Sequence, residues 1–189
     1  MTEYFDVLDE NGIKTGAIKP REEVHRDGDW HRAVYVWILN SKKELLLQKR
    51  SPEKDSHPNF WDISAAGHVL AGKNSLETAV REVEEELGLK IKESDLEYLY
   101  SYNHRTIQNN GTFINGGVYD EYLLKIDLDL SNLKLQKEEV SDVKFINYVE
   151  LEELVKNGDP TIVPHPNSYS RIFKIVHKRY NKTPQSGVS

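Results

Sequence analysis

The sequence contains no cysteine among its 189 residues. Disulfide bonds, thiolate metal sites and a cysteine nucleophile are therefore excluded. Long hydrophobic runs are missing too: the longest, at 34–39 and 45–47, are far shorter than the roughly 20 residues of a membrane-spanning helix. Basic residues number 25 against 31 acidic ones, which argues against broad nucleic-acid affinity, because phosphate backbones are bound through Lys and Arg.

The remaining composition is that of a globular protein. Apolar residues make up 38% and charged residues 30% of the chain, and this length suffices for one well-cored domain. Residues 1–9 show no basic region followed by an apolar stretch, so we expect no secretory signal. The sequence thus predicts a cytoplasmic protein without a membrane segment. Phosphate-bearing small molecules stay possible ligands, since a bound cation can invert the local charge.

Most of the chain has the alternating pattern of short strands separated by turns. Asn11-Gly12 accepts the backbone angles of a tight hairpin and is expected to join the first two strands. We expect a charged connector at 21–29, a loop at 51–59 and a turn at 109–111. Further strands are expected at 31–40, 44–50, within 60–70, 96–106, 117–126 and 142–148, and helices at 150–156 and 168–180.

The period changes to that of a helix over 75–87. Asn74 suits its N-cap and Gly88 the position after its last turn. Strands flanked by few helices predict an α+β or mixed α/β fold. We expect a hairpin and connector at 1–28, one main domain at 29–181 and a frayed tail at 182–189.

Three acidic residues of this helix, Glu82, Glu85 and Glu86, fall on one exposed face because residues three and four apart are neighbours. Carboxylates that close repel one another unless a cation lies between them. A hard divalent cation with oxygen preference, Mg²⁺ or Mn²⁺, is the natural counter-charge. The alternative is an ordinary solvated face, which is the commoner meaning of a glutamate-rich helix.

The spacing around these acids decides between the two interpretations. Gly67, Arg81, Glu82, Val83, Glu85, Glu86, Gly88 and Leu89 resemble the signature of the Nudix hydrolases, G-x5-E-x7-R-E-U-x-E-E-x-G-U with U aliphatic. One position departs from the signature, since its first glutamate is Lys73 here. The resemblance implies an α/β/α sandwich with a mixed sheet and hydrolysis of a diphosphate linked to another moiety.

The resemblance also implies roles for individual residues. Glu82, Glu85 and Glu86 would hold Mg²⁺ or Mn²⁺, with a backbone carbonyl near Gly67. Arg81 would orient the glutamates, and Glu85 would share in catalysis. A general base is expected from the same motif or from a later loop, where Glu139 is the candidate; an exposed loop acid is at least as good an interpretation of Glu139. Because the ligands are expected to be exposed, exchanging Glu86 should cost little stability.

The segment 60–68, with His25 and His31, resembles the isopentenyl-diphosphate isomerase branch of the family, and resembles still more its hydrolase members, including the Nudix domain that plants fuse to a peptidase. The isomerase needs a cysteine where this chain has Ala66, and two glutamates where 115–117 is Asn-Gly-Gly. Hydrolysis is therefore favoured. His25, His31 and His68 match the isomerase's metal ligands approximately, but we favour histidines that line a pocket or are satisfied by hydrogen bonds.

The sequence thus predicts a Mg²⁺-dependent pyrophosphohydrolase acting on a small diphosphate, either an isoprenoid diphosphate or a nucleoside diphosphate derivative. An isomerase and a non-catalytic diphosphate-binding module, to which Lys73 would point, are the alternatives. Lys49 and Arg50 are equally well explained as phosphate contacts and as surface charge. No nucleic-acid or membrane partner is expected, and a homodimer is left open.

Overall fold

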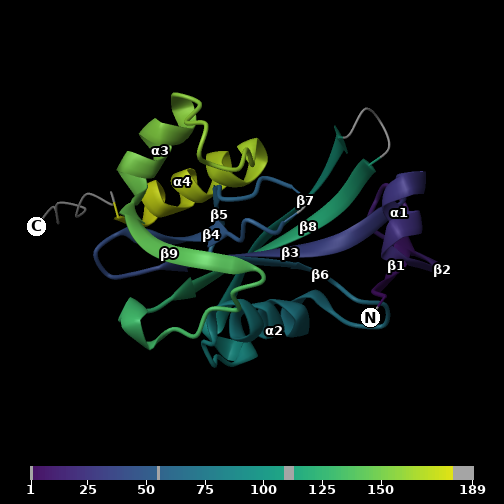
Figure 1. Cartoon of the computed structure of the whole chain (residues 1–189), viewed down its shortest axis with the longest axis horizontal. Helices are drawn as coiled ribbons and strands as arrows, with labels where there is room; N and C mark the ends of the chain where they lie inside the picture. Colours follow the sequence, from purple (N-terminus) through teal and green to yellow (C-terminus); the bar gives the residue numbers. More distant parts are fainter. Residues whose placement is uncertain (1, 55, 109–112, 181–189) are drawn as a thin grey trace, which may run out of the picture.

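The computed structural model describes residues 2–54, 56–108 and 113–180 and consists of a mixed sheet with helices on both faces (Figure 1). The predicted α+β class is confirmed. The strands are β1 (Tyr4–Leu8), β2 (Lys14–Pro20), β3 (Trp30–Leu39), β4 (Glu44–Arg50), β5 (Trp61–Asp62), β6 (Ala65–His68), β7 (Leu96–Gln108), β8 (Phe113–Lys125) and β9 (Val140–Asn147). The α-helices are α1 (Arg21–Asp27), α2 (Ser75–Leu87), α3 (Tyr148–Lys156) and α4 (Pro166–Tyr180), and short 3-10 turns lie at Glu93–Asp95 and Leu130–Asn132.

Strand β3 organises the sheet. It pairs in parallel with β8 from Trp30 opposite Gly116 to Leu39 opposite Lys125, and antiparallel with the short strand β6. Strand β4 pairs antiparallel with β5 and β9. Strands β3 and β4 pair only near Leu39 and separate beyond it. Strand β6 pairs with β3 along the part of β3 that β4 has left.

Two apolar layers fix the helices on opposite faces. Alternate side chains of β3 point to opposite sides, as the pleat requires. Val34 and Val36 pack toward α2, whereas Trp37 and Leu39 pack toward α3 and α4. Figure 1 shows the same arrangement, with α2 covering one face and α3 and α4 the other.

Helix α2 begins and ends where the sequence predicts. The Asn74 side chain accepts the Glu77 backbone N–H at 2.8 Å, which satisfies one of the free donors of the first turn. Gly88 follows the last turn with φ of +67°, and an added Cβ there would lie 2.7 Å from Cβ of Lys134. The glycine is therefore required both by the backbone angle and by the segment that crosses it.

The connector expected at 21–29 is wrong, because this segment forms helix α1. Pro20 precedes the helix with an extended backbone, Val24 is buried, and Gly28 ends it with φ of +71°. Acidic residues occupy the first turn and basic ones the last, which complements the helix dipole. The high charge of this segment thus stabilises a short helix.

Other boundaries differ by a few residues. The N-terminal hairpin is confirmed, with Gly12 at φ of +79°. Strand β8 begins four residues before the expected position, because its pairing with β7 extends to Phe113. The turn expected at 109–111 and the tail at 182–189 lie outside the described residues, and the domain division stays a prediction. Among the helices of residues 2–180 that the structure describes, none has the length and apolarity to cross a membrane.

Candidate active site

The contact between α2 and β6 brings Glu82 against Gly67. Glu82 is only 9% exposed, and a Cβ added to Gly67 would lie 1.9 Å from its Oε1 atom. The carboxylate therefore occupies the space that any other residue at position 67 would fill. Burial raises the pKa of Glu82 to about 7, although the Arg81 guanidinium opposes this shift.

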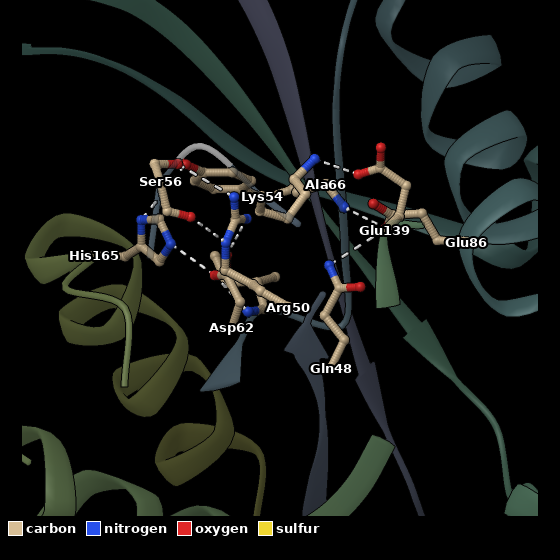
Figure 2. Close-up of polar contacts among 11 residues, drawn as sticks. Gln48, Arg50, Lys54, Ser56, Asp62, Ala66, Glu86, Glu139 and His165 are labelled. Carbon is tan, nitrogen blue, oxygen red and sulfur yellow. Dashed lines mark hydrogen bonds and ion pairs between the residues drawn. The ribbon is translucent and has the colours of Figure 1, made fainter. Parts of the chain in front are cut away.

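Glu86 lies one turn further along the same face. Its Oε2 accepts the backbone N–H of Ala66 at 3.1 Å and the side-chain amide of Gln48 at 3.4 Å (Figure 2). Burial, followed by the charge of Glu82, raises its pKa well above the ordinary value. The expected exposed ligand is thus wrong for Glu86, which is 5% exposed, because β4 and β6 close over it.

Arg81 connects two of the three predicted ligands. Its guanidinium donates to Glu82 and Glu85 and to the carbonyl of His68 at 3.4 Å. Glu85 stays half-exposed, with 51% of its side chain accessible. The structure therefore brings Glu82 and Glu86 together at β6, whereas Glu85 is held through Arg81 on the exposed side.

The segment before β9 brings Glu139 to the same place. Figure 2 shows Glu139 beside Glu86, and its charge adds to the raised pKa of Glu86. Its side chain pairs with Lys54, and its carbonyl accepts the Ser51 N–H at 2.9 Å. The N–H of Gln136 also donates to the Glu86 carbonyl at 3.1 Å, so this segment is fastened to α2.

These residues fit a hard divalent cation. Two carboxylates are buried side by side, and burial, with a smaller contribution from neighbouring negative charge, raises the pKa of both. The Oε1 atom of Gln48, next to Glu86, is buried and has no partner among the described residues. An all-oxygen donor set of this kind suits Mg²⁺ or Mn²⁺.

Without metal, we expect the free energy of unfolding to fall as the pH rises from about 4.5 to about 7. The pKa of Glu82 is about 7 in the folded protein against an ordinary value of 4.5. The folded state therefore binds more protons in this interval, and stability present below it is lost as the pH rises through it. Glu82 alone accounts for roughly 3 kcal/mol.

Urea unfolding at pH 4.5 and pH 8 measures this effect. Mg²⁺ should reduce the fall, and Glu82→Gln should make it smaller by removing the contribution of Glu82. Equal stability at both pH values, or the same fall in the Gln variant, would contradict the assignment of buried charge to Glu82.

Two other residues that the sequence singles out, Lys73 and Arg50, can now be placed. Lys73 pairs with Glu77 at 2.6 Å in an exposed position, whereas Arg81 pairs with Glu82 and Glu85. Arg50 is not an ordinary surface charge, since it donates to Asp62 at 3.1 Å and to the Ser56 carbonyl at 2.9 Å.

Sequence reasoning missed the pair formed by Asp62 and His165. The Nε2 atom of His165 lies 2.8 Å from Oδ1 of Asp62, although the residues are 103 positions apart. Figure 2 places this pair next to Arg50 and Ser56. The two flanking prolines of His165 are a visible sequence signal for a fixed backbone, but they do not indicate the partner.

His25, His31 and His68 come together at the other end of the site, with one possible ligand atom of each within 4.8 Å of the others. Nδ1 of His25 donates to the Arg21 carbonyl at 2.9 Å, and Nδ1 of His31 lies 3.3 Å from the Asp29 carbonyl. The Nε2 atoms of His25 and His31 are buried without a partner among the described residues. Hydrogen bonds therefore satisfy only one side of these rings.

The positions at which the isomerase carries acids are filled differently. Asn115 donates to the Tyr119 hydroxyl at 3.1 Å. The ring of Tyr119 lies over Gly117, where an added Cβ would be 2.4 Å away. Together with Ala66, this leaves no carboxylate or thiol in the place that the isomerase chemistry requires.

Comparisons with known proteins show which family the chain belongs to. The family profile of the NUDIX domain matches residues 29–166. The chain is 47% identical to Nudix hydrolase 3 of Arabidopsis thaliana over 182 residues, which are 94% of this chain but only 24% of that protein. It is 40% identical to an uncharacterized Nudix hydrolase of Listeria monocytogenes, with 83% of this chain and 87% of that protein covered.

Two further similarities bear on branch and fold. An isopentenyl-diphosphate Delta-isomerase of Pectobacterium atrosepticum is 34% identical over 56% of both chains. The crystal structure of a Deinococcus radiodurans protein superposes with a TM-score of 0.69 at 20% identity, over 94% of this chain and 99% of that chain. The chain therefore belongs to the Nudix hydrolase family, as the motif predicts, with isomerase-like relatives.

Proposed function

We propose that this chain is a Mg²⁺- or Mn²⁺-dependent pyrophosphohydrolase of small diphosphates, with isoprenoid diphosphates and nucleoside diphosphate derivatives as the leading substrate classes. The observation that carries the proposal is the pair of buried carboxylates, Glu82 and Glu86, held against β6 by Arg81 and by the Ala66 N–H. A folded protein can keep two buried carboxylates ionised at neutral pH when a bound cation compensates their negative charge.

The contacts support separate roles for the residues as metal ligands, as an orienting residue and as a general base. Glu82 and Glu86 would hold the cation, with Glu85 and the carbonyl near Gly67 as further ligands. A bound divalent cation neutralises phosphate charge and lowers the pKa of bound water. Arg81 fixes the Glu82 carboxylate, and Glu139, which lies beside Glu86, would receive the proton of the attacking water.

The two alternatives have weaker support. Isomerisation needs placed acid-base groups at carbon, and Ala66, Asn115 and Gly117 supply none. A non-catalytic module would be favoured by Lys73, but Lys73 pairs with Glu77 in an exposed position and leaves the contacts of Arg81 intact.

Product release from a panel of diphosphates, with and without Mg²⁺, tests the proposal. The panel comprises isopentenyl diphosphate, CDP, ADP-ribose and diadenosine polyphosphates. We expect Mg²⁺-dependent turnover of one class. Absence of turnover combined with ligand-dependent thermal stabilisation would overturn the proposal in favour of a binding module.

We also propose a second metal site at His25, His31 and His68, supported by the two unpartnered Nε2 atoms. Burial lowers the pKa of His31 to about 4, with His25 adding to the shift, so its imidazole is neutral and able to ligate. Three imidazoles favour Zn²⁺ or Co²⁺ over Mg²⁺.

Co²⁺ titration is expected to produce visible absorption bands that His31→Gln removes and that Glu86→Gln leaves in place. The half-exposed His177, which lies on α4 and outside the cluster, provides the matched control substitution, His177→Gln. A spectrum that does not change on Co²⁺ addition would contradict the second site.

A further inference from the structure

The Asp62–His165 pair is largely buried and closely hydrogen-bonded. Burial alone would raise the pKa of Asp62, but His165, Arg50 and the Ile63 N–H together lower it to about 2. Asp62 is therefore charged and accepts a proton-bearing Nε2 of His165 at 2.8 Å. In the tautomer that carries its proton on Nε2, the ring has a hydrogen-bond acceptor at Nδ1.

The Nδ1 atom faces the hydroxyl of Tyr35, which also lies against the hydroxyl of Tyr119. The hydroxyl of Tyr35 lies 3.5 Å from Nδ1 of His165, at the limit of a hydrogen bond. The ring of Tyr35 is fixed by stacking on Tyr119 at 5.0 Å and by an edge contact with His165. Tyr35 and His165 thus present a hydroxyl donor and an imidazole acceptor side by side, both with capacity for a further bond.

The sheet register links this pair through the backbone to the residues that contact Glu86, although the Tyr35 side chain lies on the face of β3 that α3 and α4 cover. Tyr35 is opposite Ala66 across β3 and β6, and Asp62 is opposite Gln48 across β5 and β4. Ala66 and Gln48 are the two residues that donate to Glu86. Figure 2 shows the same relation, with Ala66 and Lys54 between Glu86 on one side and His165 and Asp62 on the other.

On the basis of the proposed function, we propose that His165 and Tyr35 bind a hydroxyl group on the moiety that the substrate carries beyond its diphosphate. The hydroxyl would donate to Nδ1 of His165 and accept from the Tyr35 hydroxyl, while Asp62 holds the imidazole in the required tautomer. This recognition favours a sugar-bearing or nucleoside-bearing diphosphate over a hydrocarbon one, because a hydrocarbon would cover two polar atoms without satisfying them.

Calorimetric binding tests the inference without requiring turnover. Ca²⁺ replaces Mg²⁺, and the ligands are three hydroxylated diphosphates (ADP-ribose, CDP and UDP-glucose), isopentenyl diphosphate and inorganic pyrophosphate. We expect the wild type to bind at least one hydroxylated ligand more tightly than pyrophosphate. The Gln side chain in His165→Gln can still donate to Asp62 but lacks the acceptor that Nδ1 provides. We therefore expect the affinity for that hydroxylated ligand to fall about 10- to 100-fold.

Tyr35→Phe should have a similar effect, and the two changes together should cost less than their sum, because they share one ligand group. Binding of pyrophosphate and isopentenyl diphosphate should be unchanged in both variants, as should all binding in the control His177→Gln. The inference is overturned if no hydroxylated ligand exceeds pyrophosphate in the wild type, or if both variants keep the preference. Absence of hydrolysis alone would count against the proposed function and not against this contact.

Discussion

Replacing Glu86 by Gln is expected to reduce Mg²⁺-dependent hydrolysis by roughly 1,000-fold or more while the fold keeps its stability. A metal ligand contributes several kcal/mol of transition-state stabilisation, and an amide is a poor ligand for a hard cation. The amide oxygen can still accept the Ala66 N–H, which the carboxylate accepts at 3.1 Å. Local geometry is therefore expected to persist in the variant.

The stability part of this expectation rests on burial. The sequence predicts little cost because it places Glu86 on an exposed face, whereas the structure buries it. A neutral amide removes an ionised group from that environment, so the metal-free variant should melt at or above the wild-type temperature at pH 8. Glu84→Gln, an exposed position on the same helix, is the matched control. A melting temperature several degrees lower, or retained Mg²⁺-dependent turnover, would contradict the assigned role.

Exchanging Gly67 for Ala is the second substitution with a large expected effect. The new Cβ would lie 1.9 Å from Oε1, 2.0 Å from Cδ and 2.5 Å from Cγ of Glu82. Glu82 is confined by Arg81 and by its own burial, so the carboxylate must move away from β6. We expect at least about a 100-fold loss of kcat/KM and a loss of about 1–3 kcal/mol in the free energy of unfolding.

A double substitution separates these two consequences. Adding Glu82→Ala to Gly67→Ala removes the clash and should recover most of the lost stability in urea unfolding, without recovering activity. Mg²⁺ affinity, measured by calorimetry, should be weakened in both proteins. Turnover at the wild-type rate in Gly67→Ala would show that hydrolysis does not require the Glu82 carboxylate to lie against β6.

Local signals explain what the sequence predicts well. The bounds of α2 follow from an apolar stripe between Asn74 and Gly88, and the motif residues sit on that helix. The sequence does not predict helix α1, because the helix is only seven residues long and strongly charged and its pattern resembles that of a loop. Its one fully buried apolar residue, Val24, becomes visible only when the sheet is assembled.

The site is predictable only where its residues share one element. Glu82, Glu85 and Glu86 can be grouped from helical periodicity, but the burial of Glu86 depends on Gln48 and Ala66 from two separate strands. The Asp62–His165 pair depends on β5 meeting the start of α4, which no local pattern indicates. Tertiary contacts therefore determine the electrostatics, whereas the sequence determines the inventory of chemical groups.

The attachment of the 134–140 segment to α2 has a consequence for motion. Lys134 and Gln136 donate their amides to the last carbonyls of α2, those of Leu87 and Glu86, and Gln136 in turn accepts from Val140. If the 134–140 segment separated from α2, the carbonyls of Glu86 and Leu87 would lose these hydrogen bonds. Glu139 would move away from the Glu86 side chain at the same time. In hydrogen-exchange terms, these amides belong to one cooperative opening unit with the helix end. A ligand clamped by Glu86 would therefore slow the exchange of backbone amides that it never touches.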